Sequence, residues 1–594
     1  MKQAWLIVLA MFCFYVGQTQ IKTPILERKI SIEISNEKLP VALSRIAQEG
    51  KFSFSYNSTI IPNEQNVSVT AVNKTVRDLL NEIFNGSMEY KEKSNHLILT
   101  KVSLKPQSTT VSVIISGYIE DAVTKEKIAD ASVYDKKSIT SVITDEYGFF
   151  KMRLDKKEQS AFIAVSKRDY RDTLVMITAP GNQYLNISIT PIGKDSIVVQ
   201  SATATPDSTK EVLSLPYNDE PNIQNISDTL YRDIQISFLP FLGSNGSLSG
   251  NVINNYSINL LGGYSRGTRQ IELGFIVNMD RGDVSWLQIA GIGNLVGGNV
   301  YGIQASGFFN VNGGETKAAQ LTSIANINFQ DFKGVQVAAV SNINLRSADG
   351  VQVAGILNMA SAPSRGVQIA CIANLQTDRY TGPQIAGVSN IATKHISGSQ
   401  ISALFNYGRS VNGTQIGLFN IADSLSGVPI GLVSYVRNGY HKLEISADEI
   451  FYTNIAFRTG SQKLYNILLA GIKPENTTDN TKIWTFGYGL GFAPRLSRAL
   501  QLNFDLTSQH VNKGSFTNEL SLLNKVHVGI DFKLARKLSI YGGATLNGYL
   551  TNSTFTDYPV LFTGYNPSII TDHTYSTGTN LKMWFGAKVG LRFF

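Results

Sequence analysis

The chain has 594 residues, a formal net charge of +8 and 43% hydrophobic residues, enough apolar material for packed cores, which excludes a wholly disordered protein. Only 16% of its residues are charged, whereas Gly (50), Tyr (25) and Phe (29) are abundant, as in β-rich chains and membrane barrels. The basic balance suits contact with anionic lipid, and no basic run or recognition helix indicates binding to nucleic acid.

Residues 1–20 have the pattern of a secretory signal peptide. A basic start at Lys2 is followed by an apolar stretch of about a dozen residues and a small-polar exit. This stretch is shorter than the roughly 20 residues that a membrane helix needs. A lipoprotein signal at Cys13 is the alternative, but bulky Met11 and Phe12 precede that cysteine. Cleavage would leave Cys371 as the single thiol, so we expect an exported chain without an internal disulfide.

Residues 26–101 predict a small α+β domain. Isoleucines alternate within 30–34 and indicate a strand, and apolar residues have helical spacing within 39–47 and 76–84. The second helix follows a capping box that starts at Thr75. The order of elements, with "LPVALSRIAQEGKFSFSY" and "VNKTVRDLLNEIF", resembles the short N-terminal domain of secretins and signal-transducing TonB receptors. That resemblance implies a periplasmic module that contacts a periplasmic or inner-membrane protein.

Residues 112–195 carry strand patterns only. The segment "ISGYIEDAVTKEKIADASVYDKKSITSVITDEYGFFKMRL" resembles the carboxypeptidase-regulatory-like β-sandwich, a non-catalytic module. Its signature positions are Asp145, Gly148 and Phe150, where a turn would fold the phenylalanine back into the core. Residues 201–233, with Ala-Thr repeats and prolines, predict a linker.

A 16-residue repeat occupies residues 271–436. Glutamines recur at this interval, with a Glu before the series and Gln415 one residue short after it: Gln288, Gln304, Gln320, Gln336, Gln352, Gln368, Gln384 and Gln400. Six residues after each glutamine lies an asparagine: Asn294, Asn310, Asn326, Asn342, Asn358, Asn374, Asn390 and Asn406. Charged residues fall between these units, so each repeat predicts about ten strand residues and a charged turn.

Two architectures accept this repeat. Strand alternation puts Gln352 and Asn358 with Ile356 on a small, amide-lined face, and Val351 and Val353 on an apolar face. Such strands fit a transmembrane barrel, in which the amides would face the lumen. They also fit a β-solenoid with amide ladders, coiled one repeat per turn. The loops lack the period of 32 that an antiparallel barrel should give, which favours the solenoid.

The last 150 residues favour the barrel. Eight longer amphipathic strands are predicted there: 442–450, 453–459, 464–472, 483–493, 500–509, 524–534, 538–549 and 581–594. The aromatic end at Phe594 resembles the insertion signal of bacterial outer-membrane barrels, and the repeat resembles a G-x-Q-x-A-G-x-x-N surface-repeat family. Closure leaves no unpaired edge in lipid. We therefore expect a mainly β chain in which residues 235–594 form one transmembrane antiparallel barrel of about 18–20 strands. A β-solenoid joined to a smaller C-terminal barrel is the alternative.

No catalytic, cofactor or metal-binding constellation is visible. His441 and Glu444 have metal-motif spacing, but positions three apart on a strand point to opposite faces. Cys371 is interpreted as a small hydrophobe on the apolar face. The Gln and Asn rows could bind a polar solute, and hydrogen bonding to one another and to lumen water is the simpler interpretation.

The sequence thus predicts a non-enzymatic outer-membrane protein of a Gram-negative bacterium, with periplasmic N-terminal modules and a role in signalling or passive solute passage. Its expected partners are outer-membrane lipid, the barrel-assembly machinery and a protein bound through residues 26–101. The resemblance to TonB receptors lacks a plug, because only the linker separates the sandwich from the first barrel strand. The rival function is a surface structural protein or adhesin built on a solenoid.

Overall fold

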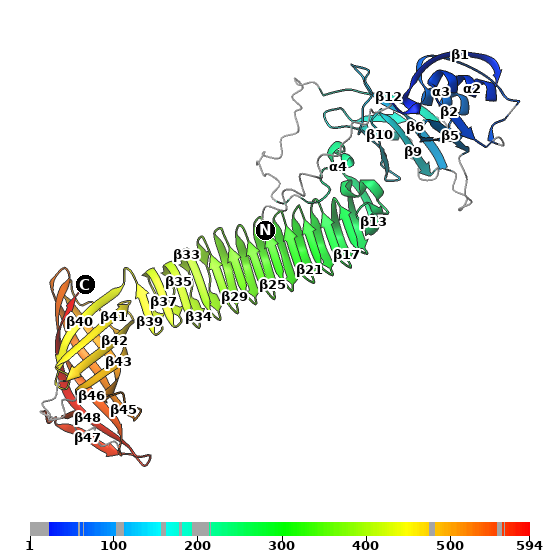
Figure 1. Cartoon of the computed structure of the whole chain (residues 1–594). Helices are drawn as coiled ribbons and strands as arrows, with labels where there is room; N and C mark the ends of the chain where they lie inside the picture. Colours follow the sequence, from blue (N-terminus) through cyan, green and yellow to red (C-terminus); the bar gives the residue numbers. More distant parts are fainter. Residues whose placement is uncertain are drawn as a thin grey trace, which may run out of the picture. The chain divides into compact units, whose positions relative to one another are not determined.

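The computed structural model describes residues 23–57, 60–62, 64–101, 112–155, 162–177, 181–192, 213, 215–473, 482–554, 561–562 and 565–593. The fold is mainly β and divides into two compact units (Figure 1). The first holds the described residues up to 192 with 217–231 and 241–252, and the second holds the described residues of 208–216, 232–240 and those from 253 onward. No helix in these described ranges is long and apolar enough to cross a membrane. The predicted signal segment and Phe594 lie outside the described residues.

The first unit begins with an α+β domain. Its elements are η1 (Ile25–Glu27), β1 (Lys29–Lys38), α2 (Leu39–Gly50), β2 (Ser53–Tyr56), β3 (Asn66–Thr75), α3 (Val76–Phe84), β4 (Met88–Lys93) and β5 (His96–Lys101). Strand β1 pairs with β3, and β5 lies between β2 and β4. The Thr75 side chain accepts a hydrogen bond from the Asp78 amide, which caps α3. Leucines and isoleucines from both helices pack against the sheets.

A β-sandwich follows in the same unit. It contains β6 (Ser112–Asp121), β7 (Ser132–Asp135), β8 (Thr140–Ile143), β9 (Phe149–Asp155), β10 (Phe162–Ser166), β11 (Thr173–Met176) and β12 (Gln183–Ile189). One sheet has the order β11-β10-β7-β8 and the other β12-β6-β9. Alternating residues of the two sheets form its hydrophobic core, which includes Phe150 and Met152.

The second half of the predicted linker is ordered structure, which corrects that expectation. Residues 217–231 include the short helix α4 (Pro221–Asn225), in which Asn222 and Ile223 are buried. Downstream, Ile226 and Leu230 join a buried cluster with Tyr134 of the sandwich. Burial of these apolar side chains favours docking over a free linker.

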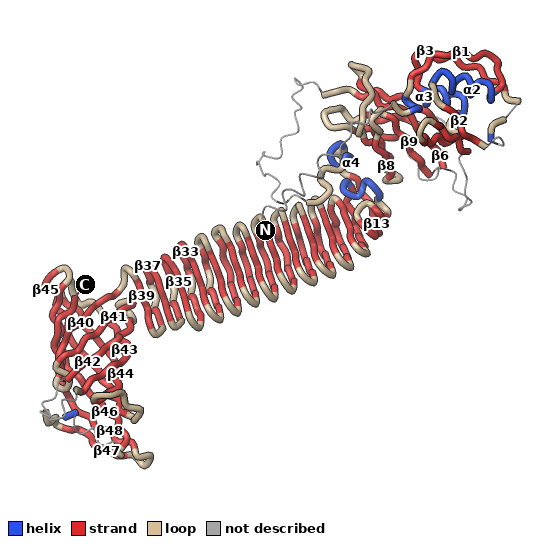
Figure 2. The backbone as a smooth tube through the Cα atoms, viewed as in Figure 1, coloured by secondary structure: helices blue, strands red, loops and turns tan. Residues whose placement is uncertain are grey.

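The 16-residue repeats form a parallel β-solenoid in the second unit (Figure 2). Strands β13 (Leu230–Leu239), β14 (Leu242–Gly243) and β15 (Val252–Asn259), with η3 (Gly246–Asn251), precede the regular coils. One side of the coils is formed by β17 (Gly267–Gly274), β19 (Val284–Ala290), β21 (Val300–Ser306), β23 (Thr316–Thr322), β25 (Phe332–Ala338), β27 (Ala348–Ala354), β29 (Ser364–Ala370), β31 (Tyr380–Thr381), β32 (Gln384–Ala386), β34 (Gln400–Ser402), β36 (Gln415–Ile416) and β38 (Pro429–Ile430). The other side is formed by β16 (Gly262–Ser265), β18 (Val277–Asp280), β20 (Gly293–Val296), β22 (Phe309–Asn312), β24 (Ala325–Asn328), β26 (Ser341–Asn344), β28 (Leu357–Ala360), β30 (Ala373–Gln376), β33 (Ser389–Ser397), β35 (Phe405–Asn412), β37 (Phe419–Leu425) and β39 (Val433–Val436).

The prediction of one barrel of 18–20 strands beginning at residue 235 is therefore wrong, and the alternative architecture is the one observed. Each repeat pairs in parallel with the next, so that Gln336 lies opposite Gln352 and Asn342 opposite Asn358. The predicted ten-residue strand bends at Gly355, which divides it into two strands on different sides of the coil. The bend turns Ile356 outward, 45% exposed, away from the amide-lined face expected for it.

The C-terminal residues form a small barrel. Among the described residues, eight antiparallel strands close on one another: β40 (Tyr440–Asp448), β41 (Thr453–Gly460), β42 (Tyr465–Lys473), β43 (Ile483–Phe492), β44 (Leu500–Lys513), β45 (Ser521–Ala535), β46 (Leu538–Asn552) and β48 (Thr579–Phe593). Pairing of β40 with β48 closes the ring, and β47 (Ile569–Thr574) adds to one end of β48. Only three residues separate β39 from β40.

Candidate functional site

The asparagine row forms a continuous ladder inside the solenoid. From Asn278 to Asn406, the side-chain Nδ2 donates to the Oδ1 of the asparagine in the following coil at 2.8–2.9 Å. The second hydrogen of each amide goes to a main-chain carbonyl, as from Asn358 to Ile369 at 2.7 Å. These side chains are fully buried. The row faces the solenoid interior and not a barrel lumen, which corrects the lumen assignment.

The glutamine row forms a second ladder that runs the opposite way. Each Nε2 from Gln304 to Gln415 donates to the Oε1 of the preceding glutamine at 2.7–3.0 Å. Ordered amide chains polarise one another, so each ladder is cooperative and carries a dipole. Opposed donor directions offset the two dipoles. The amides that could have bound a solute are thus used by one another.

A pair of buried carboxyl groups ends the glutamine ladder at its N-terminal coil. Gln288 Nε2 donates to Glu272 at 2.8 Å and to Asp280 at 2.7 Å, and Ser265 donates to Asp280 at 2.5 Å. Both carboxyl groups are fully buried. Burial and the adjacent Glu272 raise the pKa of Asp280 well above its usual range. The pair therefore favours a state in which at least one carboxyl group is protonated.

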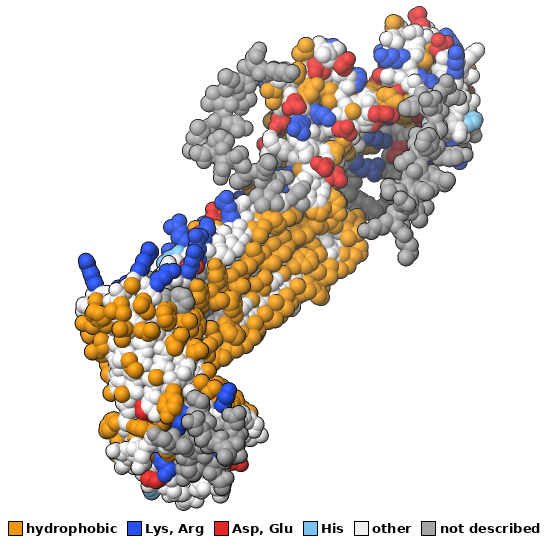
Figure 3. Space-filling view, turned by 60° about the vertical axis from the view of Figure 1, so that its left-hand side comes forward, with side chains coloured by type: hydrophobic (Ala, Val, Ile, Leu, Met, Phe, Trp, Pro, Cys, Tyr) orange, Lys and Arg blue, Asp and Glu red, His pale blue; other side chains and the backbone are white. Residues whose placement is uncertain are grey.

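The outside of the solenoid has two contrasting edges. The apolar edge is the corner after each long strand, where a small residue, or Phe275 in the first coil, precedes a large apolar one: Ile276, Ile292, Phe308, Ile324, Val340, Ile356, Ile372, Val388, Leu404, Leu418 and Leu432. Nine of these are 38–48% exposed. The charged edge is the opposite turn, which contains Asp283, Glu315, Lys317, Asp331, Lys333, Arg346, Asp349, Arg365, Asp378, Arg379, Lys394, Arg409 and Asp423. Figure 3 shows hydrophobic side chains covering a face of the solenoid along its length.

The barrel has the same inverted polarity, with apolar side chains outside and charged ones inside. On β45, Val526, Val528 and Ile530 are 42–49% exposed, while the alternating Lys525 and His527 are buried. Large apolar residues are also exposed on the other strands, including Ile445, Ile455, Phe457, Leu468, Phe486, Leu490, Leu506, Ile540, Phe585, Val589 and Leu591. An apolar belt thus surrounds the barrel.

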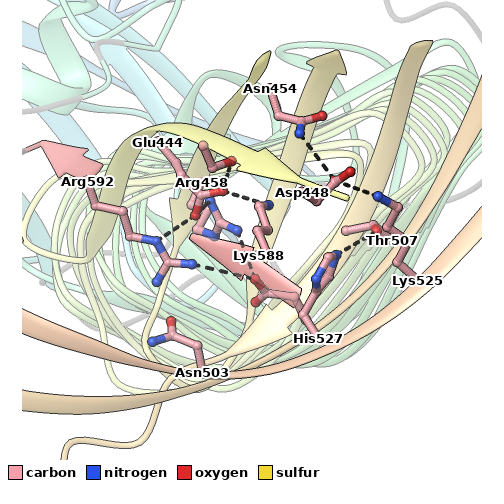
Figure 4. Close-up of polar contacts among 12 residues, drawn as sticks. Glu444, Asp448, Asn454, Arg458, Asn503, Thr507, Lys525, His527, Lys588 and Arg592 are labelled. Atoms are coloured by element: carbon pink, nitrogen blue, oxygen red, sulfur yellow. Dashed lines mark hydrogen bonds and ion pairs between the residues drawn. The ribbon is translucent and has the colours of Figure 1, made fainter. Parts of the chain in front are cut away.

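Glu444 is the centre of an ion-pair network inside the barrel (Figure 4). Its carboxylate forms ion pairs with Arg458 at 2.8 Å, with Lys588 at 2.6 Å and with Arg592 at 2.7 Å. The two arginines also reach Asp505, at 2.8 and 3.8 Å. All five side chains are 8% exposed or less.

Two further ion pairs extend the charged interior. Arg592 also contacts Asp531 at 3.2 Å, and Lys525 pairs with Asp448 at 2.5 Å. With Glu444, Asp505, Arg458 and Lys588, these groups comprise four cations and four carboxylates, so the charges balance. Balanced, hydrogen-bonded pairing is what allows charges to be buried.

The barrel rim nearest the solenoid is basic. The turns 437–442, 461–464, 493–499 and 533–537 contain no acidic residue and contain Arg437, Lys442, Lys463, Arg495, Arg498, Lys533, Arg536 and Lys537. A cavity of about 550 Å³ opens among five of these side chains above Asp531. At the other rim the described connections carry the acidic residues Glu449 and Glu519. The two ends of the barrel therefore differ in charge.

The three sandwich signature residues form one turn. The carboxylate of Asp145 accepts hydrogen bonds from the amides of Tyr147 at 3.0 Å and Phe149 at 2.9 Å. Gly148 has a φ of +75°, and the Phe150 side chain is 1% exposed in the core. Their role here is to position core side chains.

The remaining single residues take simple positions. Cys371 is exposed at the apolar edge, directly before Ile372. His441 contacts the Val436 carbonyl, whereas Glu444 faces the barrel network. In the described ranges no group of three or more His, Cys, Asp or Glu is arranged to hold a metal ion.

An open groove lies between α2 and β2 in the α+β domain. Its volume is about 720 Å³, and its lining includes Leu43, Ala47, Phe52, Phe54 and Tyr56. Strand β2 is an edge strand that pairs with β5 alone among the described strands. An edge strand beside an apolar groove is a surface to which an extended peptide can add.

Sequence reasoning missed the barrel network and the basic rim. The charges of the network alternate with apolar residues along β40, β41 and β48, a pattern that indicates inward charges, but the strand register decides which of them meet. The sequence signal for the basic rim is that every second turn between the barrel strands contains basic residues and no acidic one.

A scan of protein-family models, a search of curated proteins and a search of solved structures each found no match to this chain.

Proposed function

We propose that this is a non-catalytic outer-membrane protein whose C-terminal barrel, residues 440–593, spans the lipid bilayer as a closed anchor. The observation that carries the proposal is the inverted polarity of the barrel, which has an apolar belt outside and paired charges inside. A closed barrel satisfies its backbone hydrogen bonds internally, as hydrocarbon requires. The lumen of an eight-stranded barrel is filled by side chains, and Glu444 with its three cations occupies it here. This favours anchoring over passive passage of solutes.

The proposed orientation places the N-terminal modules in the periplasm. An even strand number brings the chain in and out at one rim, since β40 begins beside the end of β48. Connections at that rim have four residues at 461–464, seven at 493–499 and two at 536–537, whereas 26 residues link β46 to β48 at the other rim. Short turns are typical of the periplasmic side. This arrangement disfavours a surface adhesin, which would expose the solenoid outside the cell.

The proposal includes a protein partner for the α+β domain. The groove beside edge strand β2 would receive an extended segment of a periplasmic or inner-membrane protein, and this contact would link the outer membrane to a regulatory or structural partner. Substitution of Phe54 by Glu in this groove should abolish such a contact. Substitution of exposed Glu49, at the end of α2, is a matched control.

Heat-modifiable gel mobility of the detergent-extracted chain tests the anchor. A folded barrel should migrate differently before and after boiling. An epitope placed between Phe516 and Thr517 should be labelled on intact cells, and one in the 461–464 turn only after permeabilisation. A chain that stays soluble without detergent and shows no shift on boiling would refute the anchor, and reversed labelling would refute the orientation.

A further inference from the structure

We propose that the solenoid lies along the same lipid bilayer, with its apolar edge in the hydrocarbon of one leaflet and its charged edge toward water. This inference rests on the proposed membrane anchor. Its starting observation is that the solenoid is polar inside and apolar outside, the reverse of a soluble repeat protein. The occupant of the apolar edge is then lipid, and not a protein.

The apolar surface is too large and too uniform for a soluble surface. Nine corner residues expose 38–48% of their side chains, and outward residues beside the corner, such as Ile369 and Ile385, add 38% each. Eleven coils stacked about 4.8 Å apart give an apolar strip on the order of 1,000 Å². Monomeric soluble proteins rarely expose contiguous apolar patches beyond a few hundred Å².

The apolar edge has no polar side chains apart from one serine. A protein interface of this size would carry a hydrogen bond about every 100–200 Å² and a polar rim. Here the first corner position is Gly, Ala or Cys, except for Phe275 and Ser323, and the second is Ile, Phe, Val or Leu. Lipid tails need no specific contacts, so this composition favours lipid over a protein partner.

Most corner amides of the apolar edge donate to a carbonyl of the neighbouring coil, as lipid requires of buried backbone groups. The amide of Ile356 donates to Val340 at 2.8 Å, as do those of Ile292 to Ile276 and Phe308 to Ile292. Coil stacking thus replaces water as the partner of these groups, and the corner can be desolvated without leaving them unpaired.

The depth of the apolar zone matches one leaflet. On β27 the charged Asp349 is followed by outward Val351 and Val353 and then by the Ile356 corner. The five residue-to-residue steps of extended strand from Asp349 to Ala354 span about 16 Å. Half of a hydrocarbon core is about 15 Å. The charges at Asp349 and its neighbours would therefore remain at the headgroups.

Connection to the barrel fixes the solenoid near the bilayer. Three residues join β39 to β40, and Thr459 Oγ1 donates to the Ser434 carbonyl at 2.8 Å, so the last coil is bound to the barrel rim. That rim carries the eight basic residues, which suit the phosphate headgroups of anionic lipid. The direction from charged to apolar edge is the same in each coil, which permits contact along the whole stack.

Cys371 provides a native probe on the apolar edge. The full mature chain is labelled there with an environment-sensitive fluorophore and folded into phosphatidylethanolamine–phosphatidylglycerol vesicles that contain lipids with nitroxide-labelled tails. The matched control carries the label at the charged edge of the same coil, in a Cys371→Ser, Arg379→Cys variant. A third labelled variant, Cys371→Ser, Ile356→Cys, checks that the result does not depend on one position.

The expected result is a blue-shifted emission and loss of most fluorescence to the tail quencher at positions 371 and 356, with neither change at 379. Equal quenching at both edges, or no quenching at either edge, would overturn the membrane contact of the solenoid. The barrel anchor would still hold if the same samples change their gel mobility on boiling. Disulfide-linked dimers through Cys371 without quenching would identify a second copy as the occupant and also overturn it. Quenching at the apolar edge in samples whose gel mobility does not change on boiling would overturn the barrel anchor, but not the contact of the apolar edge with lipid.

Discussion

Glu444 and Arg592 lie directly opposite each other on the first and last strands of the barrel, 148 positions apart in the chain. Arg592 Nε donates to Glu444 at 2.7 Å, and both side chains are fully buried. The pair therefore lies across the seam where the barrel closes. Because Arg592 also reaches Asp531 and Asp505, a single residue connects the seam to the interior of β44 and β45.

Arg592→Ala should destabilise the closed barrel by about 3–5 kcal/mol, because it leaves carboxylates buried with too few cations. The temperature at which the detergent-extracted chain changes its gel mobility should fall. Arg498→Ala, at the exposed basic rim, is the control and should leave that temperature unchanged. Equal midpoints for the two variants would show that the seam pair does not stabilise the barrel.

Asn358→Leu should weaken the solenoid. It removes the acceptor of Asn342 and the donor to Asn374, and unpaired buried groups cost about 1–3 kcal/mol each. Faster proteolysis within residues 255–436 should report the loss. The neighbouring Met359→Leu, on the outward side of the same strand, should have little effect. A variant as resistant as the parent chain would argue against a stabilising amide ladder.

The 16-residue period alone identifies the equivalent residues of successive repeats. It does not show whether neighbouring strands run parallel or antiparallel. In the parallel solenoid Gln352 and Asn358 lie opposite the identical residues one repeat away. Alternation did not reveal the bend at Gly355, because it assumes an unbroken strand and therefore put Ile356 on the same face as Gln352 and Asn358. Identical amides in adjacent repeats hydrogen-bond in register only when the repeats run parallel, and this requirement distinguishes a solenoid from an antiparallel barrel.

The C-terminal strands were easier to predict, since their alternation is long and their turns are polar. The predicted strand at 483–493 is observed at Ile483–Phe492, and that at 453–459 at Thr453–Gly460. Their ring closure depends on the pairing of β40 with β48, which joins distant segments. No local sequence pattern encodes that contact. The sequence therefore did not show that the barrel closes without the strands of the repeats, and the predicted number of barrel strands was too high.

Gly148→Ala should destabilise the sandwich by about 1–2 kcal/mol, the cost of a left-handed conformation for a residue with a Cβ. The φ at this glycine is +75°, and a Cβ there would lie 2.9 Å from the Ile119 carbonyl oxygen. Glu146→Ala in the same turn is the control, because this side chain is exposed. Thermal unfolding should show a lower midpoint for the glycine variant only. Equal midpoints would mean that the turn relaxes without cost.

Asp280→Asn should change how the stability of the solenoid depends on pH. The folded state raises the pKa of Asp280, so folding favours its protonated form. That contribution is fully present below the ordinary carboxyl pKa of about 3.9 and is lost as the pH rises toward the raised value. An asparagine is uncharged at every pH and can still accept from Gln288 Nε2. The variant should therefore match the parent chain near about pH 4 and exceed it in stability at about pH 8.

Chemical unfolding of the detergent-extracted chain across this pH range provides the measurement. Asp378→Asn at the charged edge is the control, because Lys394 lowers the pKa of Asp378. Its pH dependence should have the opposite sign, with a small loss of stability at the higher pH. If Asp280→Asn were instead less stable than the parent chain at about pH 8, the ionised carboxylate would be the form that the first coil prefers, and the raised pKa of Asp280 would be wrong.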